Sequence, residues 1–165
     1  MEAANNSLAS GFAIYSVKVY YSQGEPQIQI CLDKLTDKYG SPSIADCEQF
    51  SHILGLKLQA LSELKEIPEN YSLEVSSPGA ERKIKIPDEL ARFRDIPMRV
   101  KLKNNEARLK YPVLQLVKND EHTSTWNFAE VKLNKKAGYN VKKKPEDAII
   151  LALNEIQEVN LHLDF

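Results

Sequence analysis

The sequence predicts an α+β protein, with a small α/β domain over residues 1–81 followed by a five-stranded β-barrel over residues 82–165. Three observations predict this fold. The first part of the chain has strand, strand, helix and strand patterns in that order. The second part has a short helical pattern and then five short strand patterns separated by polar turns. Finally, the charge of the chain changes sign close to the boundary between the two parts.

The first domain is predicted to begin with a hairpin and a helix. Residues 12–21 and 28–32 alternate apolar and polar side chains, which is typical of half-buried strands. Ser43 has the position of a helix N-cap, with Asp46 three residues later as in a capping box. Apolar residues then follow at steps of three and four, forming one face of a helix that ends near Leu64: Cys47, Phe50, Leu54, Leu58 and Leu61. Others are expected to widen this face and keep the helix well covered: Ile53, Leu56, Ala60 and Leu64.

A short strand and a tight turn are predicted to end the first domain. Tyr71, Leu73 and Val75 alternate with polar residues, as in a half-buried strand. Proline followed by glycine suits the two central positions of a type II turn, because glycine readily takes the positive φ needed at the second. The predicted interdomain turn consists of Ser76, Ser77, Pro78 and Gly79, together with Arg82.

The second domain is predicted to open with a short helix over residues 87–93, with Leu90 and Phe93 facing inward. The strand patterns cover residues 98–102, 111–117, 123–133, 148–153 and 158–163. A polar, lysine-rich stretch over residues 134–145 is predicted to be a loop. Trp126 and Phe128 are two residues apart, which favours packing on one barrel face over stacking on an unpaired base.

The distribution of charge bears on partners more than the net charge of −1 does. Residues 1–74 contain 5 Lys/Arg and 10 Asp/Glu, a net charge of −5. Residues 82–144 contain 17 Lys/Arg and 7 Asp/Glu, a net charge of +10. Residues 145–165 contain 5 acids and no Lys or Arg, so the basic domain has an acidic end.

Several classes of protein are disfavoured by the composition. No run of eighteen or more apolar residues is present, so we expect no membrane span. Cys31 and Cys47 lack the spacing of a metal or redox motif, and the three histidines are scattered. Ser76 and Ser77 lack the Gly-x-Ser-x-Gly context of a hydrolase nucleophile, so turn hydrogen bonds are their expected role. We therefore expect no enzyme activity, no cofactor and no metal.

The chain resembles the bacterial ribosome maturation factor family RimP over residues 10–165. The stretch Tyr71–Gly79 followed by Arg82 is similar to the family's most recognisable signature. The weaker matches are residues 12–32, 43–48, 92–94, 148–151, 155–156 and 159–161, which follow the family's order. The resemblance implies an α/β domain followed by an Sm-like barrel. It also implies a non-enzymatic role in maturation of the small ribosomal subunit, in contact with its rRNA and a ribosomal protein.

Two departures from the family pattern stand out. Residues 2–10 are shorter than the first helix usual in the family, which suits a truncated or repacked first domain. Residues 132–144 are longer and more basic than a tight barrel turn requires, and such a loop, with a presequence outside this sequence, suits a plastid descendant. Plastid stroma and bacterial cytoplasm therefore both stay open as compartments, and we expect a monomer.

Basic residues in the second domain are the candidates for RNA binding: Arg82, Lys83, Lys85, Arg92, Arg94, Arg99, Lys101, Lys103, Lys135, Lys136, Lys142, Lys143 and Lys144. A solvated charged face and a solvated loop are the alternatives for most of them. Arg82 has two possible roles: bracing the turn, through backbone carbonyls or a carboxylate such as Glu74, and direct rRNA contact. Lysine contacts to phosphate would add salt-sensitive affinity without reading sequence.

The acidic first domain would repel a phosphate backbone and suits a basic ribosomal protein. The leading hypothesis is thus a small-subunit assembly factor that binds a precursor through rRNA and one basic protein. Its rivals are an Sm-type RNA-binding module, which would form rings, and a protein–protein adaptor without RNA contact.

Overall fold

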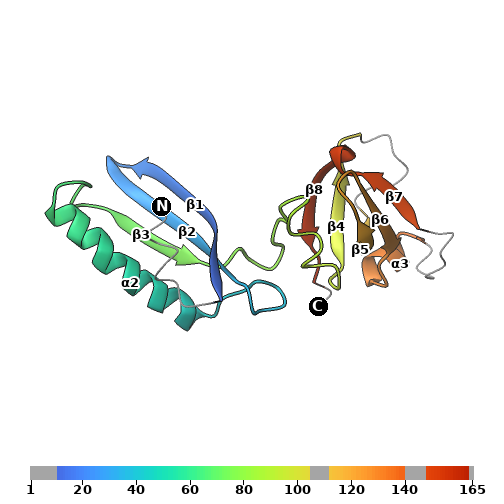
Figure 1. The fold of residues 1–165 in the computed structure, drawn as a ribbon, viewed down its shortest axis with the longest axis horizontal. Helices are drawn as coiled ribbons and strands as arrows, with labels where there is room; N and C mark the ends of the chain where they lie inside the picture. The colour runs from blue at the N-terminus through green and yellow to red at the C-terminus, as the bar shows by residue number, and fades with distance from the viewer. Residues whose placement is uncertain (1–10, 105–111, 140–147, 164–165) are drawn as a thin grey trace. The chain divides into compact units, whose positions relative to one another are not determined.

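The computed structural model describes residues 11–104, 112–139 and 148–163 (Figure 1). The chain divides into two compact units, residues 1–79 and residues 80–165. Of the RNA-binding candidates, Lys142, Lys143 and Lys144 lie outside the described residues.

The first unit has the predicted β-β-α-β order. Its elements are β1 (Phe12–Ser22), β2 (Glu25–Lys34), α2 (Ile44–Glu63) and β3 (Ser72–Ser76). The sheet order is β1-β2-β3, with β1 antiparallel and β3 parallel to β2. A parallel pair needs a long crossover connection, and α2 supplies it. The helix lies along one face of the sheet (Figure 1).

The predicted N-cap of α2 is confirmed. The backbone N–H of Asp46 donates to Ser43 Oγ at 3.2 Å, and the N–H of Ser43 donates to the Asp46 carboxylate at 2.8 Å. Lys34 Nζ also donates to this carboxylate, at 2.9 Å. Hydrogen bonds from Lys34 and then Ser43 lower the pKa of Asp46 from 3.8 to about 2. The charged form of Asp46 therefore stabilises the start of α2.

Replacing Asp46 by asparagine is expected to make the first unit less stable near neutral pH but not near pH 2. A carboxyl whose pKa is depressed on folding stabilises the protein above its unfolded pKa, here 3.8, and this contribution is lost as pH falls toward 2. The difference in melting temperature between wild type and Asp46→Asn should thus shrink from pH 5 to pH 2. Thermal unfolding of both proteins across this range measures it. Glu66→Gln is a control with the same charge change, and a difference independent of pH would refute the assignment.

The apolar face of α2 is narrower than predicted. The residues on the predicted stripe, such as Phe50 and Leu58, are half-buried. The prediction that neighbouring residues widen this face is wrong: Ile53 is 37%, Leu56 57% and Leu64 68% exposed, and Ala60 is exposed as well. One three-stranded sheet covers a single stripe of a helix, and these residues all lie to one side of it. Among the described residues of this unit, the buried core consists of Ile30 and Leu32.

The second unit contains the five predicted strands: β4 (Met98–Leu102), β5 (Val113–Asn119), β6 (Thr123–Phe128), β7 (Ile149–Ala152) and β8 (Ile156–Leu161). They form one antiparallel sheet in the order β7-β6-β5-β4-β8, and a 3-10 helix, η2 (Leu153–Glu155), joins β7 to β8. In the described part of the chain, no ladder joins the edge strands β7 and β8. Closure of the sheet into a barrel is therefore not detected.

The core of the second unit is large and includes Trp126. Its side chain is fully buried, and its indole N–H donates to Ser124 Oγ at 2.7 Å. Met98 and Val100 of β4 are buried in this core. The expectation that Trp126 packs in the core is confirmed. Phe128 is half-buried and stacks on Tyr139, with ring centroids 4.7 Å apart and planes 12° apart.

Two local predictions in this unit are wrong. Residues 87–93 form a series of turns instead of a helix, in which the N–H of Leu90 bonds the carbonyl three residues back. Leu90 and Phe93 are nevertheless buried, as predicted. The strand predicted over residues 123–133 ends at Phe128. The first residues of the loop predicted over 134–145 belong instead to the short helix α3 (Lys132–Lys136).

Buried Asn134 explains the position of α3. Its Oδ1 accepts a hydrogen bond from the N–H of Val113 at 3.2 Å. Its Nδ2 donates to the carbonyls of Val113 at 2.6 Å and Ala129 at 2.8 Å. Val113, Ala129 and Val131 form a small buried cluster beside it. The Asn134 side chain therefore forms hydrogen bonds with backbone groups at the start of β5 and after the end of β6.

Replacing Asn134 by leucine is expected to lower the free energy of unfolding of the second unit by about 3 kcal/mol. Three hydrogen bonds of about 1 kcal/mol each would be lost, and buried backbone groups would lack partners. Urea unfolding, followed by the fluorescence of the single tryptophan, measures the change. Lys136→Ala, an exposed change on the same helix, is the control. A loss similar to that of the control would show that Asn134 does not hold these strands together.

Candidate nucleic-acid interface

The segment Arg82–Ile84 runs along the outer edge of β8. The N–H of Ile84 donates to the carbonyl of Val159 at 2.8 Å, and the N–H of Leu161 donates to that of Arg82 at 2.9 Å. Lys83 forms a single antiparallel bridge with Asn160. Because β4 pairs with the other edge of β8, this strand has neighbours on both sides.

Arg82 differs from the other basic candidates because its side chain is fully buried. Its guanidinium is paired with the carboxylate of Glu89 and lies 4.9 Å from the ring centre of Phe93. The carboxylate therefore comes from within the second unit instead of from Glu74. A buried ion pair is costly to break, because removing one partner leaves the other charge without compensation. The geometry suits a bracing role for Arg82.

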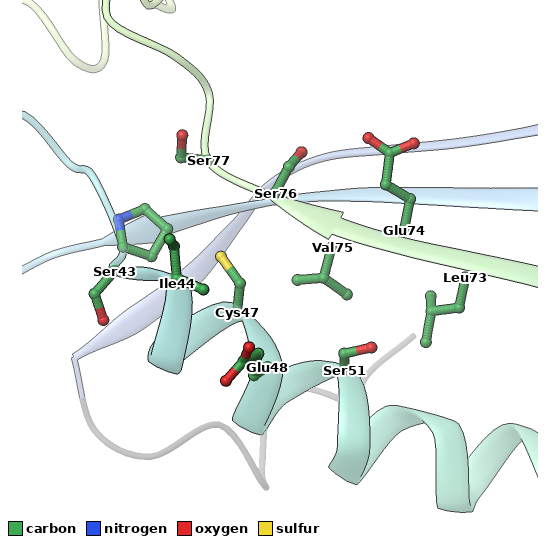
Figure 2. Close-up of a pocket in the computed structure, with 11 residues that line it drawn as sticks. Ser43, Ile44, Cys47, Glu48, Ser51, Leu73, Glu74, Val75, Ser76 and Ser77 are labelled. Atoms are coloured by element: carbon green, nitrogen blue, oxygen red, sulfur yellow. The ribbon is translucent and has the colours of Figure 1, made fainter.

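Among the residues of the predicted turn, Gly79 has the expected backbone conformation. Gly79 has φ of +86°, the positive value that the turn prediction requires. The N–H of Gly79 points to Ser77 Oγ at 3.4 Å, and Ser76 Oγ lies 3.6 Å from Cys31 Sγ. Both serines therefore take part in local contacts at the end of β3 (Figure 2).

Three of the basic candidates lie together across β8 and β4. Arg99 is opposite Asn160, and Lys101 is opposite Glu158, in the β4–β8 register. Lys83 Nζ lies 3.7 Å from the Glu158 carboxylate, and an Arg99 nitrogen lies 3.9 Å from that of Glu81. This face is therefore basic with interspersed acids, and its ion pairs are long and solvent-exposed. Such pairs contribute little to stability.

Four further candidates lie in the turns before β4 and directly after β4. The guanidinium of Arg92 lies 4.7 Å from the ring centre of Phe93, and that of Arg94 donates to the carbonyl of Val117 at 3.0 Å. Lys85 is exposed, and its backbone N–H donates to the Glu89 carboxylate at 2.9 Å. Exposed Lys103 follows β4, where its backbone N–H donates to the carbonyl of Glu155 at 2.9 Å.

Helix α3 carries the remaining described candidates, Lys135 and Lys136. Both are exposed, and Lys135 Nζ lies 3.2 Å from the Glu130 carboxylate. The structure thus distributes the cations over four places: the β4–β8 face, the turns before β4, the residue after β4, and α3. Sequence reasoning missed Glu89 and Asn134, because neither lies in a pattern that indicates its distant partner.

The described residues offer no competing site for a metal, because their His, Cys, Asp and Glu side chains nowhere gather in groups of three or more that could hold an ion. No helix in the described ranges is both long and apolar enough to cross a membrane.

Comparisons with known proteins address both units. Residues 4–81 match the RimP N-terminal domain, and residues 83–162 match a domain of unknown function, DUF7912. Over 167 residues, the chain is 30% identical to the ribosome maturation factor RimP of Leptospira biflexa, covering 95% of this chain and 90% of that protein. The chain belongs to the RimP family.

Other RimP proteins match shorter stretches. The chain is 41% identical to the RimP of Leptospira interrogans over 95 residues, or 57% of this chain. That match spans about half of the relative's length, 56%. The RimP of Prochlorococcus marinus (strain SARG) is 32% identical over 123 residues, covering 73% of this chain and 75% of the relative. The predicted family is confirmed.

Proposed function

We propose that the chain is a maturation factor of the small ribosomal subunit that acts as a binding scaffold without a chemical step. The observation that carries this proposal is the similarity to the RimP of Leptospira biflexa over 95% of the chain. The protein would act in the bacterial cytoplasm or the plastid stroma.

The second unit would bind rRNA as an open, Sm-like barrel. Its last strand, β8, pairs with its first, β4, and the cations of this face project from a rigid sheet. Phosphate contacts of this kind fix position without reading bases. The proposed contacts are Lys83, Lys85, Arg92, Arg94, Arg99, Lys101, Lys103, Lys135 and Lys136, with Lys142, Lys143 and Lys144 outside the described residues. We leave Arg82 out of this surface, because its side chain is buried.

The first unit would bind a basic ribosomal protein. Residues 1–79 contain 5 Lys/Arg and 10 Asp/Glu, so the unit has a net charge of −5. Opposite charge steers a basic protein toward this unit and repels RNA phosphates. The two units would thus bind different components of one precursor particle.

An Sm-type ring is the second candidate, and the edge of β8 argues against it. Edge-to-edge assembly of open sheets needs an unpaired strand at both ends. The outer edge of β8 is already bonded to the segment Arg82–Ile84. This arrangement supports a monomer.

Cosedimentation with precursor small subunits tests the proposal against its rivals. We expect the chain to sediment with the precursor and to leave it as salt increases, because phosphate contacts release counterions. Failure to sediment with the precursor would refute the ribosomal role. Binding that does not change with salt would favour the adaptor.

A further inference from the structure

Strand β3 is the edge of the first unit's sheet. It pairs with β2 in a parallel ladder from Ser72 to Ser76, and in the described ranges no strand pairs with its other side. Along such an edge, alternate residues direct their N–H and C=O groups outward. An exposed row of this kind is a template for pairing with another chain.

A groove of about 550 Å³ lies between this edge and the first half of α2 (Figure 2). Leu73 and Val75 project from β3 toward the helix, and Cys47 projects from the helix toward the strand (Figure 2). Ile44, which lines the groove at the start of α2, is 80% exposed. The groove is therefore lined by apolar side chains of both β3 and α2, with polar side chains of the helix beside them, and it provides space for side chains of an added strand.

The two faces of β3 differ in chemistry. Glu74 and Ser76 point away from α2, on the opposite face from Leu73 and Val75 (Figure 2). The carboxylate of Glu74 accepts a hydrogen bond from Gln29 Nε2 at 2.8 Å and is exposed. Glu48 adds a second carboxylate at the rim, on the helix. A cation on an added strand would thus have an acid beside it on the Glu74 face.

We propose that the β3 edge binds an extended protein segment by strand addition, with apolar residues alternating with Lys or Arg. Because side chains alternate between faces with a period of two, one set would enter the groove while the other lies beside Glu74. Main-chain hydrogen bonds supply affinity in this mode, and the groove supplies selectivity. The inference rests on the proposed function in one respect: it takes the acidic unit to be the part that binds protein.

Titration of the full chain with a short labelled peptide of alternating lysine and valine tests the mode of binding. We expect saturable binding with amide NMR shifts concentrated at Ser72–Ser76. A peptide of the same composition, with its lysines and valines in separate blocks, should bind at least about tenfold more weakly, because it cannot match both faces. A backbone N-methylated copy of the alternating peptide should also lose binding, because it cannot donate to the β3 edge.

Charge variants test the site. Glu74→Lys should weaken binding of the alternating peptide about tenfold, because attraction becomes repulsion between neighbouring strands. Glu63→Lys, the same change near the end of α2, should leave it unchanged. Glu48→Lys, a second variant that lies outside the sheet, should also weaken binding. Misfolding of one variant would then not decide the result.

Three outcomes would overturn the inference. If the block-sequence or N-methylated peptide bound as tightly as the alternating peptide, attraction by charge alone would explain the binding. Amide NMR shifts outside Ser72–Ser76 would show that the site lies elsewhere. Self-association of the free chain through β3 would make a second copy the occupant. If the chain still cosediments with precursor subunits in any of these cases, the proposed function stands and only strand addition fails.

Discussion

Replacing Glu89 by alanine is expected to destabilise the second unit by about 3–5 kcal/mol. The change would leave the guanidinium of Arg82 buried without this carboxylate, which is among the costliest single losses in a protein. The N–H of Lys85 would also lose its acceptor. The single tryptophan, Trp126, lies in the core of this unit, so its fluorescence during urea unfolding reports the loss directly.

A paired substitution separates the ion pair from simple loss of packing. The double variant Arg82→Met with Glu89→Leu is expected to regain most of the stability, because apolar residues of similar size often replace a buried pair without net cost. Glu81→Ala, which removes an exposed acid 3.9 Å from Arg99, serves as the control. If the folded double variant bound rRNA with a changed salt dependence, Arg82 would contact RNA after all. An unchanged dependence is expected.

Neutralising the cations of β4, together with Lys103 just after it, is expected to have the largest effect on RNA binding. In the triple variant Arg99→Gln, Lys101→Gln and Lys103→Gln, three proposed phosphate contacts are lost. Each lost contact lowers the slope of log affinity against log salt by about 0.7–0.9, so the slope should fall by about 2–3. Filter binding to precursor rRNA over a range of salt concentrations measures this slope.

A matched variant in the acidic unit controls for net charge. Lys18→Gln, Lys57→Gln and Lys65→Gln remove the same number of positive charges from exposed positions of the first unit. This variant is expected to keep the wild-type slope, since that unit is not proposed to touch RNA. Equal effects of the two triple variants would show that total charge, and not the β4 face, governs binding.

The elements predicted best from sequence are those whose signals are local. The start of α2 was predictable because Ser43 and Asp46 bond each other within one turn. The strands were predictable because their alternation of apolar and polar residues records which face meets the core. Gly79 was predictable for a similar reason, since a turn of this type needs positive φ at that position.

The features that sequence reasoning missed depend on contacts between distant residues. Asn134 lies in a lysine-rich stretch that resembles a loop, and its role appears only when it meets Val113, 21 residues away. The pairing of Arg82 with Glu89 likewise depends on the turns that bring them together. Exposure of Leu56 on α2 was missed because periodicity indicates an apolar face but not how much of it a small sheet can cover.

The small core of the first unit has a consequence for the lifetime of the protein in the cell. With Ile30 and Leu32 as its buried apolar residues among those described, this unit gains less from burial than the second unit does. A ligand that binds only the folded form shifts the equilibrium away from open, protease-sensitive states. Copies of the protein bound to a partner would therefore persist longer than unbound copies. Degradation would then match the amount of this protein to the number of particles being assembled.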